Sequence, residues 1–106
     1  MIDLSKINGF DWDTGNIDKN LKKHGISTKE AEEVFLDEDL AIERDIRHQE
    51  IEERYIAVGK SFARKILFII FTFRKEKIRI ISARIANKKE RRIYAQNAQK
   101  NPKIQK

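Results

Sequence analysis

Six polar side chains in this sequence are suited to chemistry on a phosphodiester: Lys23, His24, Glu53, Arg54, Arg79 and Arg84. A protonated imidazole can donate a proton to a leaving oxygen, a carboxylate can accept one from an attacking hydroxyl, and fixed guanidinium groups stabilise a pentacoordinate phosphate. An RNA substrate supplies its own nucleophile, the 2′-hydroxyl. These residue types therefore indicate acid/base and electrostatic catalysis on RNA.

The two histidines differ in what surrounds them. His24 ends a predicted helix, where the exposed carbonyl groups and the helix dipole favour an imidazolium. It is either a general acid or phosphate clamp, or a residue that caps the helix, and Lys23 has the same two interpretations. His48 lies in an acidic loop with Glu50, where a structural role is favoured. Glu53 is considered as the general base because it opens a predicted strand.

The arginines converge only under one condition. Arg79 and Arg84 are five residues apart, so an ideal strand would direct them to opposite faces. A strand end or a bulge near Ser82 would bring them together. With Arg54 on a neighbouring strand end they would form a fork-like phosphate clamp. Each arginine is equally suited to a solvated position with its stem over apolar neighbours.

Length and charge favour one small domain with a polyanionic partner. The 106 residues suffice for a single core, predicted over residues 1–98 and followed by a disordered basic tail over 99–106. Residues 1–53 carry 7 Lys/Arg and 15 Asp/Glu, whereas residues 54–106 carry 16 and 2. Such a basic second half attracts nucleic acid. The same charge is also consistent with an acidic protein partner or with a merely solvated surface.

Several classes of site and location are excluded. Cysteine is absent, which excludes disulfides and thiolate zinc sites. There is no Gly-rich phosphate loop, nucleophile elbow or paired acidic motif for two metals, so we predict neither a cofactor nor a metal. The longest apolar run, residues 66–71, is too short to span a bilayer, and a cytoplasmic location without a membrane partner is expected.

The pattern of residues predicts an α+β fold. A short strand over 7–12 is followed by a helix from Asp13 or Thr14 that ends at Gly25. A capping box at Ser27 starts a second helix that buries Ala31, Val34 and Phe35. An antiparallel four-stranded meander then follows, with strands at 40–43, 54–60, 66–73 and 77–83. Its central strand is apolar on both faces, which predicts cover by the two helices on one side and by the last helix or a partner on the other.

A last helix is predicted from Lys88 to Gln96, capped by Asn87 and Glu90. Ile93 is its expected apolar contact, and Tyr94 is expected to be semi-exposed. The residues predicted to contact RNA are Lys23, Lys88, Arg91, Arg92 and Tyr94.

A family resemblance joins these patterns. The segments that carry it include Phe10-Asp11-Trp12-Asp13, Lys23-His24-Gly25-Ile26-Ser27, Glu53-Arg54, Ile78-Arg79-Ile80-Ile81-Ser82-Ala83-Arg84 and Glu90-Arg91-Arg92. In this order they resemble the BrnT-type toxins of bacterial type II toxin–antitoxin systems, from about Phe10 to Tyr94. The loop at 44–52 departs from the usual family pattern, and the tail after Asn97 lies outside the resemblance.

The resemblance implies a fold similar to RelE-type ribonuclease toxins and RNA cleavage that inhibits translation. It also implies neutralisation by a BrnA-like antitoxin, in a heterotetramer that binds operator DNA through the antitoxin. By position it implies Lys23, His24, Glu53, Arg54, Arg79 and Arg84 as site residues, with Trp12, Tyr55 and Tyr94 as stacking or packing aromatics. Two alternatives remain open from the residues alone: a non-catalytic RNA- or ribosome-binding module, and a pure interaction protein.

Overall fold

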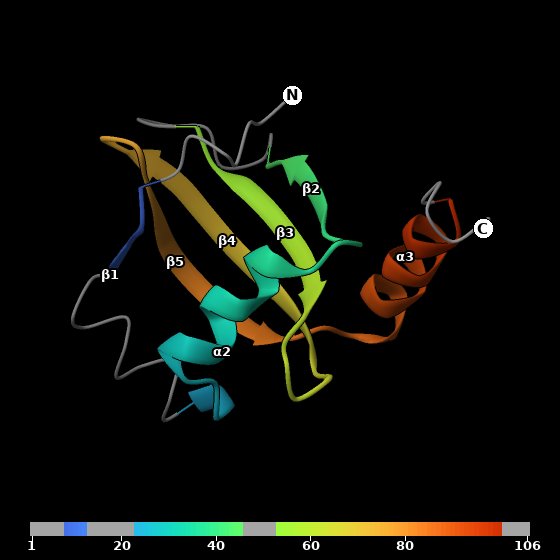
Figure 1. Cartoon of the computed structure of the whole chain (residues 1–106). Helices are drawn as coiled ribbons and strands as arrows, with labels where there is room; N and C mark the ends of the chain where they lie inside the picture. The colour runs from blue at the N-terminus through green and yellow to red at the C-terminus, as the bar shows by residue number, and fades with distance from the viewer. Residues whose placement is uncertain (1–7, 13–22, 46–52, 101–106) are drawn as a thin grey trace.

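A mixed five-stranded sheet forms the centre of the computed structural model, which describes residues 8–12, 23–45 and 53–100 (Figure 1). The strand order is β1-β5-β4-β3-β2. The strands are β1 (Phe10–Trp12), β2 (Ala41–Arg44), β3 (Tyr55–Lys60), β4 (Ile66–Arg74) and β5 (Lys77–Ile85). Strands β2 to β5 pair antiparallel in sequence order, and β1 adds to β5 in parallel. The α+β class is thus confirmed, with a parallel edge strand that the alternation of residues did not predict.

The second predicted helix begins as expected. Ser27 accepts a hydrogen bond from the Glu30 backbone N–H, and the Glu30 side chain accepts one from Ser27 in return. This capping box opens α2 (Thr28–Glu33), which continues as a short 3₁₀ turn, η2 (Val34–Leu36). Of the first predicted helix, only residues 23–24 lie within the described ranges, and they are helical. Gly25 follows them at φ +66°, the left-handed conformation that ends a helix.

The last helix, α3 (Lys88–Gln99), is three residues longer than predicted. Its start is confirmed, because Asn87 and Glu90 form the expected capping box. The helix includes Gln99, which the sequence assigned to the tail, while residues 101–106 lie outside the described part. Within the described residues, no helix is long and apolar enough to cross a membrane.

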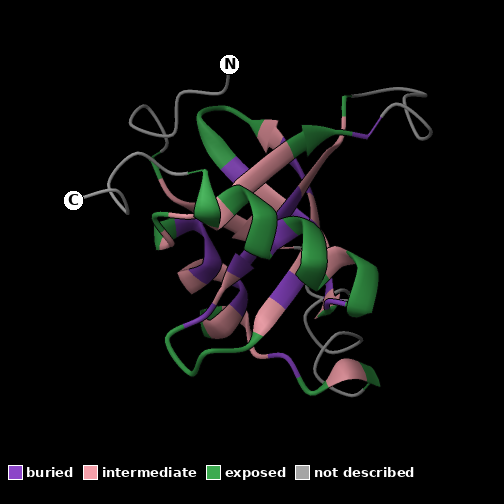
Figure 2. Cartoon of the chain, turned by 90° about the vertical axis from the view of Figure 1, so that its right-hand side faces the viewer, coloured by how far each residue is buried: buried purple, intermediate pink, exposed green. Residues whose placement is uncertain are grey.

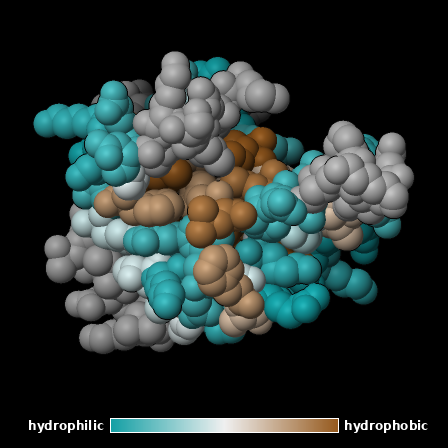
Figure 3. Space-filling view, viewed as in Figure 1, coloured by the Kyte–Doolittle hydropathy of each residue, from teal (hydrophilic) through white to brown (hydrophobic). Residues whose placement is uncertain are grey.

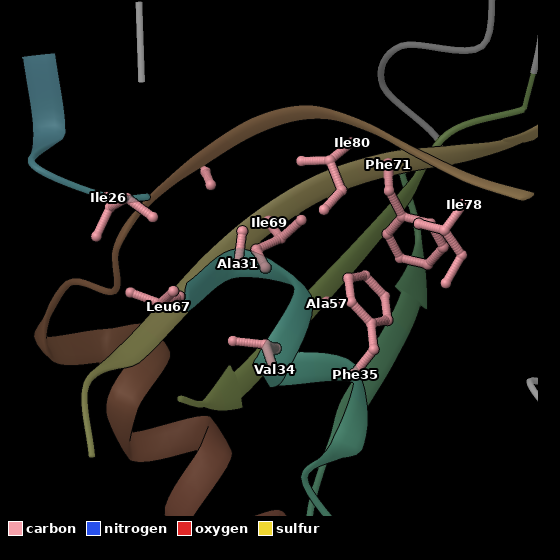
Figure 4. Packing of buried hydrophobic residues seen from close by; sticks show 11 residues of the cluster. Ile26, Ala31, Val34, Phe35, Ala57, Leu67, Ile69, Phe71, Ile78 and Ile80 are labelled. Atoms are coloured by element: carbon pink, nitrogen blue, oxygen red, sulfur yellow. The ribbon is translucent and has the colours of Figure 1, made fainter. Parts of the chain in front are cut away.

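The hydrophobic core lies between α2 and the sheet (Figure 4). The predicted burial of Ala31, Val34 and Phe35 is confirmed, since all three are buried against β4 residues such as Phe71. The rings of Phe35 and Phe71 meet edge to face with centroids 5.1 Å apart. Burying each large apolar side chain contributes roughly 1.5–3 kcal/mol, so this layer fixes α2 on one face of the sheet.

A bulge in β5 changes which residues share a face. Ile70 of β4 pairs with Ser82, but the next residue, Phe71, pairs with Ile80, so Ile81 is an extra residue in β5. The bulge lies next to Ser82, the position at which a bulge was needed for Arg79 and Arg84 to share a face. Beyond it, Arg79 lies opposite Thr72. The condition for the convergence of the arginines is therefore met.

The opposite face of the sheet is only partly covered. Helix α3 and the end of β3 meet there, where the ammonium of Lys60 lies 5.9 Å from the centroid of the Tyr94 ring. Val58 is buried, whereas Phe68 and Ile70 remain half-buried. Most of α3 is exposed (Figure 2), and the half-buried state of Phe68 and Ile70 shows that the middle of this face is in part accessible.

Candidate nucleic-acid interface

The face turned away from α2 carries most of the cationic side chains of the sheet. We call it the arginine face and define it by the cross-strand neighbours Phe68, Thr72, Arg74, Lys77, Arg79 and Arg84. Alternation along β4 and β5, corrected for the bulge, directs these six side chains to one side. On the other side, Leu67, Ile69 and Phe71 are fully buried under α2.

The β4–β5 hairpin concentrates charge at one end of this face. Arg74 pairs across the strands with Lys77, and the two turn residues between them, Lys75 and Glu76, both have positive φ values of 49° and 67°. Such a two-residue turn follows the right-handed twist of a hairpin. It brings three cationic residues, Arg74, Lys75 and Lys77, together at the hairpin tip.

Strand β1 adds a carboxylate to this cationic end. The parallel register sets Asp11 beside Arg79, and Asp11 Oδ2 lies 3.2 Å from Arg79 Nη1. A backbone hydrogen bond from Asn8 to the Glu76 carbonyl, 2.7 Å long, fastens the start of β1 to the hairpin tip. A cavity of about 410 Å³ opens here, lined by Asp11, Arg74, Lys75 and Lys77. We call this the hairpin cavity.

Arg54 lies next to the same end of the sheet. The hydroxyl of Thr72 donates a 2.6 Å hydrogen bond to the Glu53 carbonyl, which fixes the chain where it enters β3. Because Tyr55 packs on the α2 side, alternation directs Arg54 toward the arginine face. Its half-buried side chain forms no ion pair within the described part of the chain. Continued from Tyr55–Phe71, the strand register sets Arg54 and Arg79 on either side of Thr72.

Arg84 occupies the other end of the arginine face. Its guanidinium makes two 2.8 Å hydrogen bonds to the Glu90 carboxylate and lies 4.1 Å from the centroid of the Phe68 ring. Burial raises the pKa of Glu90, but the bonds from Arg84 and from the Asn87 backbone outweigh it, so the pKa lies below its usual value. Phe68 and Thr72 are four residues apart on β4, which separates Arg84 from Arg79 by about 13 Å along the strand. The three predicted arginines share a face but do not form one fork.

Glu53, the predicted base, faces the other way. Its carboxylate accepts hydrogen bonds from Arg44, at 2.7 Å, and from the hydroxyl of Tyr55, at 2.8 Å. The Tyr55 ring stacks on Phe71, with centroids 5.6 Å apart, on the α2 side. The hydrogen bond to Glu53, assisted by burial, raises the pKa of Tyr55 above its usual value. The Glu53 carboxylate is therefore on the opposite face from Arg79.

The residues before α2 are also away from the arginine face. Lys23 is exposed and His24 half-buried in the short helical turn below α2 in Figure 1. Neither makes an ion pair with a described residue. His48 lies outside the described residues. Trp12 has a structural contact on the α2 side, because its indole N–H donates a 2.8 Å hydrogen bond to Glu32.

Helix α3 corrects two predictions. Tyr94 is buried rather than semi-exposed, with 5% of its surface accessible, and Ile93, the expected apolar contact, is 44% exposed. The reason is the Tyr94 hydroxyl, which donates a 2.6 Å hydrogen bond to Asp37 and orients this side of α3 toward the core. Burial, together with that hydrogen bond, raises the pKa of Tyr94 far above its usual value. Three other predicted RNA contacts on this helix are exposed: Lys88, Arg91 and Arg92.

A second, larger hollow of about 910 Å³ lies along β2. Its lining combines apolar residues such as Leu40 and Ile42 with the acidic residues Asp37, Glu38 and Glu43. Apolar side chains gather in the middle of the α2 side (Figure 3). The acidic lining of the hollow would repel a phosphate backbone, so the arginine face is the better surface for a polyanion.

None of the four residues that line the hairpin cavity was predicted from the sequence as a site residue: Asp11, Arg74, Lys75 and Lys77. The cationic residues around the turn at 74–76 were a usable signal, since a two-residue turn makes its flanking residues neighbours. The position of Asp11 could not be predicted from the sequence, because it depends on the parallel pairing of β1 with β5. Among the described residues, no group of three or more His, Asp or Glu side chains could hold a metal ion.

Fold and surface together define a small α+β protein with one cationic sheet face suited to a nucleic acid. The comparisons with known proteins make this class specific. The chain belongs to the BrnT family, described as the ribonuclease toxin BrnT of type II toxin–antitoxin systems, whose family model matches residues 12–90. A search of curated proteins finds no significant match.

A solved structure supports the fold. The chain is similar to the ribonuclease toxin BrnT of Brucella abortus, known from a crystal structure at 1.1 Å resolution, with a TM-score of 0.57 and 20% sequence identity. The similarity covers 76% of this chain and 97% of that one. At this identity, the similarity demonstrates a shared fold.

Proposed function

We propose that this protein is an endoribonuclease toxin that cleaves RNA without a metal ion and thereby inhibits translation. Membership of the BrnT family carries the proposal, since the family model spans residues 12–90. The arginine face supports it, because fixed cations on a rigid sheet can bind a phosphate backbone and stabilise charge that develops on a phosphate. We also propose the RelE-like character of the fold that the sequence resemblance implies.

The cations of the hairpin end fit the electrostatic part of such a reaction. Arg79 is positioned by β5 and by its ion pair with Asp11. Arg54 lies at the same end of the sheet, directly after Glu53, whose carbonyl accepts the hydrogen bond from Thr72. Both would contact non-bridging oxygens of the scissile phosphate, where a guanidinium can form two parallel hydrogen bonds. Arg84, stacked on Phe68, would hold a phosphate or a base further along the strand.

The acid and base predicted from the sequence fit this face less well. Glu53 is engaged by Arg44 and Tyr55 on the α2 side. His24 precedes α2 and makes no ion pair with a described residue. A substrate on the arginine face would take its electrostatic stabilisation from the arginines and its proton transfers from groups nearer the hairpin cavity.

We further propose that a BrnA-like antitoxin neutralises the toxin, in a heterotetramer that binds operator DNA through the antitoxin. The family carries this proposal as well. The excess of 16 Lys/Arg over 2 Asp/Glu in residues 54–106 supports it. A surface this basic would bind cellular RNA at all times unless a partner covered it.

Incubation of the purified chain with a labelled RNA tests the proposal directly. We expect fragments to accumulate in proportion to protein concentration, and a chain carrying Arg54→Ala and Arg79→Ala should produce far fewer. Binding without cleavage would instead identify a non-catalytic RNA-binding module, the alternative that needs the same cations but no acid or base. If the chain neither binds nor cleaves RNA, the alternative that remains is a pure interaction protein.

A further inference from the structure

We propose that Asp11 is the catalytic carboxylate of this protein: it takes the proton from the RNA 2′-hydroxyl in the hairpin cavity. The inference rests on the proposed ribonuclease function and adds a specific residue and location to it. Neither the sequence patterns nor the family comparison assigned Asp11 a role.

The position of Asp11 supports this role first. A general base must lie within hydrogen-bond reach of the proton that it abstracts while the phosphate is held nearby. Asp11 Oδ2 lies 3.2 Å from Arg79 Nη1, and the Asp11 side chain is 40% exposed, so it is accessible to a substrate. A phosphate bound to Arg79 would thus have a carboxylate at its side.

The second argument for a catalytic role of Asp11 is the composition of the cavity. Asp11 lines the hairpin cavity with Arg74, Lys75 and Lys77. Among the described residues of this lining, three cationic side chains accompany one carboxylate, a charge balance that attracts a phosphodiester. The two paired strands and the tight turn fix the backbone positions of these four residues before the substrate arrives.

The third argument for a catalytic role of Asp11 is the location of Glu53. A base and the phosphate clamp must act on the same side of the sheet. Asp11 shares the arginine face with Arg79, whereas the Glu53 carboxylate lies with Tyr55 over the α2 side. Asp11 therefore satisfies the geometric requirement that Glu53 does not.

The reaction balances with groups of this cavity. The proton of the 2′-hydroxyl passes to Asp11 as the bond from the 2′-oxygen to phosphorus forms. The bond from phosphorus to the 5′-oxygen breaks, and that oxygen takes a proton from the ammonium group of Lys75 or Lys77. The products are a 2′,3′-cyclic phosphate and a 5′-hydroxyl. Transfer of the proton from Asp11 to the neutral lysine, directly or through water, restores both groups.

The decisive experiment compares cleavage with binding in Asp11→Asn. Single-turnover cleavage of a short RNA should fall by about 10²–10⁴-fold, the usual contribution of a general base. Binding of the same oligonucleotide with 2′-O-methyl groups, which block cleavage, should stay within a few-fold of wild type. A merely structural role of Asp11 would weaken binding and cleavage together.

Glu30→Gln is the matched control. Glu30 is also a carboxylate paired with a cation, Lys65 at 2.9 Å, but it lies on α2, and glutamine preserves the capping box. Its cleavage rate should equal that of wild type. Asp11→Glu keeps the charge and moves the carboxylate by one methylene, so it should bind normally and cleave about 10²-fold more slowly. This variant also serves as the test if Asp11→Asn does not fold.

The outcomes separate the two proposals. If wild type cleaves RNA and both Asp11 variants cleave equally well, the inference about Asp11 is wrong and the ribonuclease function stands. Parallel losses of binding and cleavage in a folded Asp11→Asn would also overturn it. A wild-type chain that binds but does not cleave RNA would overturn the ribonuclease function itself, and the inference with it.

Discussion

Arg79 and Arg84 point to the same face of the sheet although five residues separate them, because Ile81 is an extra residue in β5. Without the bulge, strand alternation would place one of the two under α2, in the hydrophobic core. An unpaired guanidinium in the core would cost several kcal/mol. The bulge therefore allows one strand to supply apolar residues to the core and both arginines to the opposite face.

This arrangement predicts unequal effects of removing the arginines. Arg54→Ala and Arg79→Ala should each reduce RNA cleavage by roughly 10²-fold or more, since they remove charge stabilisation next to the hairpin cavity. Arg84→Ala should have a smaller effect, because its guanidinium lies about 13 Å away along the strand. Initial cleavage rates, with thermal unfolding measured in parallel, check this prediction.

Lys29→Ala provides the control for lost positive charge, because Lys29 is exposed on α2, the other side of the molecule. It should cleave like wild type. If all three arginine variants also cleave like wild type, the phosphate clamp is elsewhere.

Local signals made most of the fold predictable. The four antiparallel strands lie within two residues of their expected bounds, and both capping boxes, at Ser27 and Asn87, start helices where predicted. These features depend on alternation and on residues three positions apart. The parallel pairing of β1 with β5 was not predictable, because it joins Asp11 to Arg79 across 68 positions and depends on how the whole chain folds.

Gly59 should tolerate no side chain. A Cβ added there would lie 2.7 Å from Val34 Cγ1 and 3.2 Å from the Val34 carbonyl oxygen, where η2 crosses β3. Gly59→Ala should therefore lower the free energy of unfolding by about 1–3 kcal/mol through overpacking. Chemical denaturation measures the loss. The double variant Gly59→Ala, Val34→Ala should lose less than the sum of the two single losses, because Val34→Ala removes the clashing methyl group. An unchanged stability of Gly59→Ala alone would contradict the close packing.

Glu90 should make stability depend on pH. Its pKa in the folded protein lies below the ordinary value of 4.5, so its contribution to stability is present above that value and is lost as pH falls through the lowered pKa. Glu90→Gln keeps the capping box but removes the charged pair with Arg84. The variant should be less stable than wild type at pH 7, and the difference should shrink as the pH falls below about 4. Denaturation curves that differ equally at both pH values would contradict this.

The candidate site was less predictable than the fold. The sequence left open whether Arg79 and Arg84 share a face, which the bulge at Ile81 decides, and it did not show that the Glu90 carboxylate pairs with Arg84. It also predicted Tyr94 to be semi-exposed, because nothing local reveals that Asp37 accepts the hydrogen bond of its hydroxyl. Ion pairs and hydrogen bonds between distant segments decide which charged groups can face a substrate.

The antitoxin proposal predicts a stable and inactive complex. Co-expression with the product of a neighbouring antitoxin gene should yield a complex in which an acidic segment neutralises the basic surface. RNA cleavage assays on the purified complex check this outcome. Formation should weaken at high salt if charge dominates the contact. A stable complex that still cleaves RNA at the full rate would contradict neutralisation.

Metal independence is the last prediction, and it concerns how the reaction is driven. Fixed cations at the hairpin end, such as Arg79 and Arg74, can supply the electrostatic stabilisation that a divalent ion provides in other nucleases. Cleavage should therefore persist in excess EDTA, and it should weaken as salt screens the phosphate contacts. Because the 2′-hydroxyl is the nucleophile, the fragments should end in a 2′,3′-cyclic phosphate or the 3′-phosphate derived from it, which mass spectrometry distinguishes from other ends. Fragments with 3′-hydroxyl ends, or activity restored only by an added divalent ion, would refute this mechanism and leave the family assignment intact.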